Sequence, residues 1–269
     1  MQQAGRLRPR AGLHAGRQRH MFTGMKQAKP PVSTNSRVAA PRDRSGASEI
    51  DAFVRQARAV AATKASGEGR LILALDATMS RQPTWDLACS LQAEMFDTVG
   101  KAGSLAVQLV YFRGFGECRT SKFVTDTTAL KRLMTGIDCR GGATQIGKVL
   151  THALKQTEGQ KVAALVYIGD AMEERIDDLA DKAGRLGLRG VPIFVFQEGR
   201  DRDAETAFKE IARLTKGAWF RFDHNSAAAL AKLLSAVALF ATGGLKALEA
   251  RGRPEDRLMI ENMRGGKTP

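Results

Sequence analysis

LILALDATMS, residues Leu71–Ser80, is the stretch that decides the fold of this chain. Five apolar residues run up to Asp76, and hydroxyl side chains follow at Thr78 and Ser80. A short continuous apolar run is typical of a strand buried on both faces, as in a parallel sheet. Because an extended chain alternates its side chains, we expect the three polar groups to point to one side. A carboxylate and two hydroxyls are oxygen ligands of the kind that hard cations prefer.

The composition indicates one large core preceded by a basic segment. The chain has 269 residues, of which 43% are hydrophobic, so one or two domains are expected. Residues 1–48 hold ten Lys and Arg against the single acid Asp43, which gives this segment +9 of the total +14. The three cysteines are far apart and form no CxxC pair. This pattern favours a reducing compartment, and we interpret the protein as cytoplasmic.

No stretch resembles a secretory signal or a membrane span. The most apolar late segment, 233–245, is 13 residues long and contains a Gly-Gly pair, which makes it too short to cross a bilayer. The first twenty residues are rich in Arg and free of acids, a composition that an organelle transit peptide shares. The alternative is that translation starts at Met21 or Met25.

Four segments are expected along the chain. Residues 1–47 lack apolar periodicity and should be disordered. Residues 48–66 carry apolar side chains three and four apart, which predicts an amphipathic helix packing on the domain. Residues 67–249 form the main domain, and residues 250–269 are expected to be a C-terminal tail.

Apolar strands alternate with helical patterns within the main domain. We expect strands at 71–75, 105–112, 122–125, 162–168, 191–196 and 219–222, and helices at 83–99, 126–134, 145–156, 174–186, 204–215 and 226–249. This alternation predicts an α/β fold with a doubly wound, mostly parallel central sheet and helices on both faces. The connector 113–119 is too short for a crossover helix, so one antiparallel edge strand is expected.

Two further oxygen-bearing side chains are expected at the same sheet edge. Asp170 follows the strand 162–168, and Thr144 begins a helix after a Gly-Gly pair. The carboxyl ends of parallel strands share one edge, where open α/β sheets bind their ligands. Taken singly, each residue is a common turn or helix-cap residue. Together with Asp76, Thr78 and Ser80, they predict a cation site.

The order and spacing of these pieces resemble the metal-ion-dependent adhesion site of the von Willebrand factor type A (VWA) domain, whose fold is Rossmann-like. That family's motif is Asp-x-Ser-x-Ser, then a Thr in a Gly-containing loop, then an Asp after a later strand. The resemblance covers residues 69–249. This chain departs from the motif at Thr78, where Ser is usual, and at Ala171, where Gly is common. Neither departure removes an oxygen that could bind the cation.

The resemblance implies Mg²⁺ (or Mn²⁺) as the bound ion. Thr78 and Ser80 would ligate it directly, and Asp76 and Asp170 would bind directly or through waters. Thr144 would join when a partner is engaged. Hydroxyl ligands leave the charge of the ion less compensated than a cage of carboxylates would.

The resemblance further implies an interaction module, not an enzyme, with the ion binding an exposed Asp or Glu of a partner protein. Bacterial intracellular members of the family often work beside AAA-type ATPases or in multiprotein complexes. A partner-binding rim is expected at Arg113, Phe115, Glu117, Arg119 and Arg140. Its arginines can steer an acidic ligand toward the cation, although a solvated basic rim is the plain alternative.

A phosphatase is the main enzymatic alternative. Asp76 and Asp170 also resemble the first and last motifs of haloacid-dehalogenase-like phosphatases, which use an aspartyl-phosphate. Asp76 would then be the nucleophile, and Asp170 with Glu174 would hold Mg²⁺. Against this reading, Thr78 stands where most such hydrolases have an acid, and Ser80 would have no role.

Two weaker alternatives involve phosphate groups. Gly142-x-x-x-x-Gly147-Lys148 is nearly a phosphate-binding loop, but Val149 replaces the Ser or Thr that the motif requires. The basic residues 1–47 offer a different function class, nucleic-acid binding without sequence readout.

Overall fold

The computed structural model describes residues 69–81, 105–223 and 227–265. The segment expected to be disordered, 1–47, and the helices expected at 48–66 and 83–99 lie outside the described residues.

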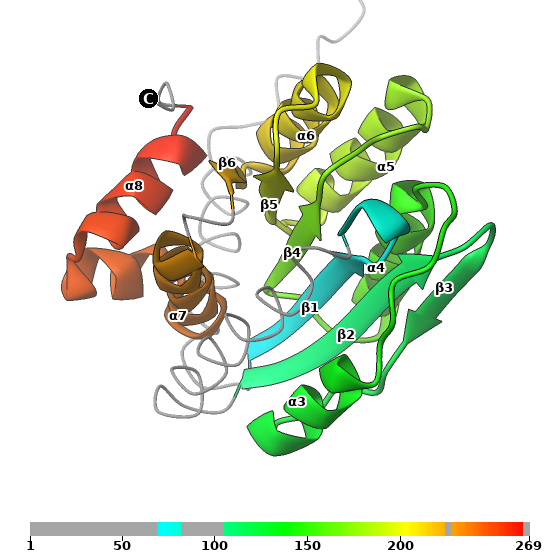
Figure 1. The fold of residues 1–269 in the computed structure, drawn as a ribbon. Coiled ribbons are helices and arrows are strands. Elements are labelled where there is room, and N and C mark those ends of the chain that lie inside the picture. Colours follow the sequence, from blue (N-terminus) through cyan, green and yellow to red (C-terminus); the bar gives the residue numbers. More distant parts are fainter. Residues whose placement is uncertain (1–68, 82–104, 224–226, 266–269) are drawn as a thin grey trace, which may run out of the picture. The chain divides into compact units, whose positions relative to one another are not determined.

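The described residues form a six-stranded sheet with the order β3-β2-β1-β4-β5-β6 (Figure 1). The strands are β1 (Gly69–Asp76), β2 (Leu105–Arg113), β3 (Glu117–Thr120), β4 (Ala164–Gly169), β5 (Ile193–Glu198) and β6 (Ala218–Phe222). Neighbouring strands pair in parallel, except that β3 is antiparallel to β2. The expected doubly wound, mostly parallel sheet with one antiparallel edge strand is confirmed.

Helices cover both faces of the sheet (Figure 1). They are α3 (Thr127–Thr135), α4 (Ile146–Gly159), α5 (Ile176–Leu188), α6 (Arg202–Thr215), α7 (Ala227–Arg251) and α8 (Pro254–Met263), with a short 3₁₀ helix η2 (Met79–Arg81) after β1. Apolar side chains of α4, α5 and α6 form one core with one face of the sheet. Those of α3, α7 and α8 form a second core on the other face.

β1 lies in the middle of the sheet and contributes to both cores. Its apolar run Leu71–Leu75 is at most 1% exposed. Leu71, Leu73 and Leu75 belong to one core, and Ile72 and Ala74 to the other. Burying a Leu or Ile side chain contributes roughly 1.5–3 kcal/mol, so this strand anchors both layers and fixes where Asp76 emerges.

The antiparallel edge strand lies earlier in the chain than expected. It forms at Glu117–Thr120, whereas in the expected strand 122–125 only Val124 pairs, through an isolated bridge to Val107. Gly114 and Gly116 have positive φ angles of 60° and 133°, which glycine adopts without steric cost. They allow a tight hairpin, so pairing begins directly after the turn.

The C-terminal segment that we expected to be a tail forms the helix α8. Met259 is 0% exposed and Ile260 is 8% exposed, and both pack in the core with α7 and the sheet. A buried ion pair between Arg251 and Asp256 fixes the junction of the two helices. The tail prediction missed this because a helix of ten residues gives only a short periodic pattern.

Helix α7 extends the apolar segment noted in the sequence. Within the described residues, it is the one helix with the length and apolar composition of a membrane span, and 56% of that stretch is buried. It packs against β1, β2 and β4. Gly244 interrupts the helix with a φ of 67° and a ψ of −164°. In this structure, α7 therefore packs on one face of the sheet as part of the hydrophobic core.

Candidate functional site

The first piece of the candidate site is the loop after β1. Asp76 is fully buried, and its Oδ1 accepts a hydrogen bond of 2.8 Å from the backbone N–H of Thr78. Its Oδ2 is buried without a hydrogen-bond partner among the described residues. The hydroxyls of Thr78 and Ser80 are hydrogen-bonded at 3.0 Å. The chain turns here into η2 instead of staying extended, so a turn brings the hydroxyls together, where we had expected strand alternation to do so.

The Asp76 carboxyl lies in surroundings that disfavour its charge. Burial raises its pKa most, hydrogen bonds from Thr78 lower it, and the negative charge of Asp170 raises it again, to about 6. Because β1 and β4 are neighbouring parallel strands with Leu75 opposite Ile168, Asp76 and Asp170 both lie at the carboxyl end of this strand pair. Such a pair of carboxylates is stabilised when positive charge is added.

The other two pieces lie on the loops before α4 and after β4. Asp170 follows β4, and its Oδ1 is buried and without a partner in the described part of the chain. Thr144 is 7% exposed, and its hydroxyl accepts a hydrogen bond of 3.0 Å from the backbone N–H of Glu173. The backbone N–H of Thr144 in turn donates to Glu173 Oε2 at 2.9 Å.

Backbone contacts join the three loops. The N–H of Arg140 donates to the carbonyl of Ala77 at 3.0 Å, and Thr78 forms a parallel bridge with Arg140. These contacts connect the loop after β1 with the loop before α4. The reciprocal Thr144–Glu173 bonds then connect that second loop with the loop after β4. The structure thus assembles the three sequence pieces at one sheet edge.

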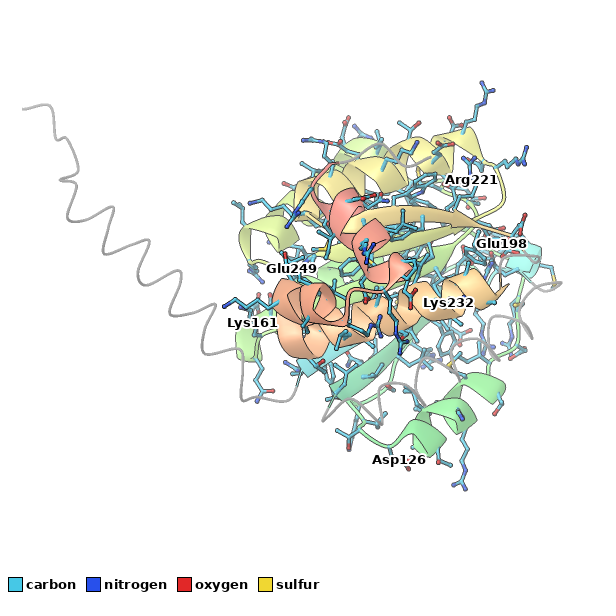
Figure 2. The ribbon with its side chains drawn as sticks, turned by 90° about the vertical axis from the view of Figure 1, so that its left-hand side faces the viewer. Asp126, Lys161, Glu198, Arg221, Lys232 and Glu249 are labelled. Atoms are coloured by element: carbon cyan, nitrogen blue, oxygen red, sulfur yellow. The ribbon has the colours of Figure 1, made fainter. Side chains whose placement is uncertain are left out.

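A buried arginine belongs to this edge, and sequence analysis did not find it. Arg81 is 1% exposed, and its guanidinium forms an ion pair with Glu198 at the end of β5. Its positive charge also lowers the pKa of Asp76. Figure 2 shows Glu198 beside the cyan β1–η2 segment, at the opposite end of the sheet from Lys161. The only sequence signal for this residue was that a single basic side chain directly follows Ser80.

Two acidic residues after β4 hold the start of α4. Glu174 accepts hydrogen bonds from the backbone N–H groups of Ile146 at 2.6 Å and Gly147 at 2.8 Å. Gly147 permits this approach, because a Cβ there would lie 2.9 Å from Glu174 Oε1. The N-cap residue itself, Gln145, makes no side-chain cap. Glu174 therefore satisfies two N–H groups that a helix start leaves open, and Glu173 bonds to Thr144 just before the helix.

The expected rim residues form an ion-pair network beside the site. Arg113 bonds to Glu117 and Asp138, Arg140 bonds to Asp138 at 2.9 Å, and Arg119 bonds to Glu117 at 3.3 Å. These hydrogen bonds lower the pKa of Glu117 and of Asp138. Three arginines against two acids leave a smaller positive excess than the arginines alone suggested. Asp138 was not expected in the rim.

The hairpin tip holds Phe115 in solvent. The side chain of Phe115 is 91% exposed. Gln145 donates to the carbonyl of Gly114 at 3.2 Å, and Lys148 donates to the carbonyl of Gly116 at 2.9 Å. Gly142 packs so closely that a Cβ there would lie 2.1 Å from the carbonyl oxygen of Gly114. The turn is therefore held firmly to the loop before α4.

Solved structures identify the fold. It is similar to a von Willebrand factor type A protein from Catenulispora acidiphila, with a TM-score of 0.55 and 17% identity over 66% of this chain and 43% of that one. It is also similar to the SpRpn10 VWA domain, with a TM-score of 0.52 and 11% identity over 61% of this chain and 94% of that one. The fold is that of a VWA domain.

A third similar structure is the human COPII-coat protein Sec24c, with a TM-score of 0.50 and 13% identity over 65% of this chain. This chain spans 30% of that protein and less than half of the Catenulispora protein. No protein-family model and no curated protein matches the sequence. At these identities, the comparisons show the VWA fold alone.

Lys148, Cys118 and Cys139, which the sequence also offered as candidate functional groups, have structural roles in this VWA fold. Lys148 of the near phosphate-binding loop is engaged with Gly116 and, at 2.8 Å, with Gln145 Oε1. Cys118 packs against the core of α4 to α6, whereas Cys139 lies in the core of α3, α7 and α8. The two thiols are therefore on different faces of the sheet. Burial raises the pKa of both, that of Cys139 to about 11.

Proposed function

We propose that this chain is a protein-interaction module that holds Mg²⁺ (or Mn²⁺) at the carboxyl edge of its sheet and binds an acidic side chain of a partner protein. The ligands would be Asp76, Thr78, Ser80, Thr144 and Asp170. The setting that we propose is the cytoplasm, with an AAA-type ATPase or another member of a multiprotein complex as the partner.

The observation that carries this proposal is a pair of buried carboxylate oxygens without a hydrogen-bond partner, Asp76 Oδ2 and Asp170 Oδ1. A buried polar atom left without a partner costs about 1–3 kcal/mol, and more when it is charged. Native proteins rarely keep such atoms unless an ion or water satisfies them. A cation at this edge would satisfy both.

The charge balance of the site supports a divalent cation. Three carboxylates (Asp76, Asp170 and Glu198) stand against the guanidinium of Arg81. When all are ionised, three negative charges and one positive charge leave −2, and Glu173 and Glu174 on the loop after β4 add further negative charge, which favours a cation. The described residues contain no group of three or more Asp, Glu, His or Cys placed to hold a metal. In the proposed site, the hydroxyls of Thr78, Ser80 and Thr144 would complete the set, with coordination positions left for water and a partner carboxylate.

The contacts of Glu174 favour an interaction module over the phosphatase alternative. In that alternative, Glu174 would be a Mg²⁺ ligand, but its two oxygens accept from the backbone of α4 at 2.6 and 2.8 Å. Releasing it would leave the start of α4 uncapped. Ser80, which has no role in a phosphatase, is hydrogen-bonded to Thr78 within the loop.

The direct test is calorimetric titration of the full chain with Mg²⁺. We expect saturable binding by the wild type and by the control Asp181→Ala, an exposed acid of α5. Asp76→Ala should lose the binding because it removes a charged ligand. Equal titration curves for the wild type and Asp76→Ala would contradict the proposed ligand set.

The partner is tested with the same proteins immobilised in native lysate. Wild type and Asp181→Ala should retain a protein in Mg²⁺ and release it in EDTA, whereas Asp76→Ala should not retain it. Identical recoveries in every arm would exclude metal-dependent binding. Phosphatase turnover that is abolished in Asp76→Asn would instead support the enzymatic alternative.

A further inference from the structure

Tyr167 of β4 carries a buried hydroxyl that the fold does not use. The residue is 2% exposed, and its ring stacks on Phe112 at 6.4 Å and meets Phe208 edge-on at 5.4 Å. Its Oη has no hydrogen-bond partner among the described residues. Phenylalanine would pack equally well here, as it does on both sides. The hydroxyl therefore costs free energy that packing does not explain.

The hydroxyl points toward the candidate cation site. A Cβ added at Gly169 would lie 2.4 Å from Tyr167 Oη, so this oxygen reaches the carboxyl end of β4, next to Asp170. Burial raises the pKa of Tyr167 well above its ordinary value, and the negative charges of Asp76, Asp170 and Glu174 raise it further. The phenol thus stays protonated and presents a donor to a negatively charged edge.

We propose that the Tyr167 hydroxyl belongs to the cation site, where it forms a hydrogen bond with a water of the bound ion's coordination shell. This inference rests on the proposed function and adds a residue to it. Tyr167 is then a positioning residue, because it acts on the ion through that water. Neither the sequence motif nor the five ligands include it.

The chemistry of Mg²⁺ calls for such a group. The ion usually keeps several waters, and a buried water needs two to four polar partners. The hydroxyls of Thr78 and Ser80 are paired with each other, and that of Thr144 accepts from Glu173. The other unpartnered buried oxygens of the site are Asp76 Oδ2 and Asp170 Oδ1, which accept hydrogen bonds and donate none when ionised. Tyr167 supplies a further partner for such a water, with an oxygen that can accept and an O–H that can donate.

The test compares Tyr167→Phe with Tyr111→Phe. The chain has two tyrosines, and Tyr111 lies on β2, separated from β4 by β1, and packs against the other core, so it is a matched control. We expect calorimetric Mg²⁺ titration to give the wild-type Kd for Tyr111→Phe and a Kd about tenfold higher for Tyr167→Phe, the usual range for groups that support metal ligands. Without metal, the melting temperature of Tyr167→Phe should equal or exceed that of the wild type.

The other outcomes distinguish a failure of this inference from a failure of the proposed function. A wild-type Kd for Tyr167→Phe overturns the inference and leaves the proposed function intact. Absence of Mg²⁺ binding by the wild type overturns both. A second measurement needs no variant: in wild-type protein with ¹³C-labelled tyrosine, Mg²⁺ should shift the ring signals of Tyr167 and leave those of Tyr111 in place. Unchanged Tyr167 signals in a protein that binds Mg²⁺ overturn the inference as well.

Discussion

At the scale of single residues, Glu174 shows how the site loops are held in place. A helix start exposes four N–H groups, and its partial positive charge favours a carboxylate. In this chain, the carboxylate comes from the loop after β4 and bonds to Ile146 and Gly147 of α4. The helix cap therefore also connects two loops of the candidate site.

Removal of this cap should destabilise the protein measurably. We expect Glu174→Ala to lower the free energy of unfolding by about 1–3 kcal/mol, because two partly buried N–H groups lose a charged partner. Urea denaturation followed by circular dichroism measures the effect. Glu158→Ala, an exposed acid near the other end of α4, should change the stability by less than about 0.5 kcal/mol. Equal midpoints for the two variants would show that Glu174 caps nothing of consequence.

The sequence indicated the sheet edge for Asp76, Thr144 and Asp170 because each lies near the end of a strand or the start of a helix, whereas Thr78 and Ser80 meet through the turn η2 and not through strand alternation. Arg81 was missed because its burial depends on η2, a turn of three residues that leaves no periodic signal. Tyr167 was missed for a related reason. Within the apolar run of β4, it has the pattern of a core residue, and only the path of its ring toward Gly169 reveals the role of the hydroxyl.

At the scale of elements, the junction of α7 and α8 depends on one ion pair. Arg251 donates to both oxygens of Asp256, whose side chain is 0% exposed. Burial raises the pKa of Asp256, but the bonds from Arg251 and from the backbone of Arg253 lower it by more, so the net pKa is below its ordinary value.

The sign of this shift gives a pH prediction. A carboxyl whose pKa is lower in the folded state contributes stability above its unfolded pKa of about 3.9, and that stability is lost as the pH falls through the folded pKa. Asp256→Asn should therefore reduce the stability at pH 7 by roughly 2–3 kcal/mol and should cost progressively less below about pH 4. Thermal melts from pH 7 to pH 2 measure this, with Asp181→Asn as the exposed control. A deficit independent of pH would contradict the ion-pair explanation.

The elements that sequence analysis predicted best are those with uninterrupted apolar patterns. β1, β2, β4 and β5 are buried on both faces, so their apolar runs indicated them directly. The half-exposed β3 has no such run, and its position depends on the backbone freedom of Gly114 and Gly116. The pairing of α8 with α7 is a tertiary contact, which local periodicity does not encode.

At the scale of the whole molecule, most of the net positive charge and the candidate site lie in different parts of the sequence. Residues 1–48 carry ten of the basic side chains and one acid, whereas the proposed metal ligands lie between residues 76 and 170. If the two regions act independently, the basic segment is dispensable for the proposed metal site.

Deletion of residues 1–47 should therefore leave the Mg²⁺ Kd unchanged. The same deletion should abolish any binding of the full chain to a 20-base-pair DNA duplex, measured by fluorescence anisotropy. For the full chain, that affinity should fall by roughly 10³-fold or more between 50 and 200 mM salt, because nearly all its attraction is to phosphates. Retained DNA binding by the truncated protein would place a nucleic-acid surface on the VWA fold itself.

Helix α4 connects the carboxyl ends of the parallel strands with their amino ends. Its first turn is tied by Glu174 to the loop that carries Asp170. Its last residues accept bonds of 3.2 and 3.0 Å from Arg70, at the start of β1, through Gln156 and Gln160. Fourteen residues span about 21 Å. The loop after β4 and the start of β1 are therefore connected through a single helix, at opposite ends of the parallel strands.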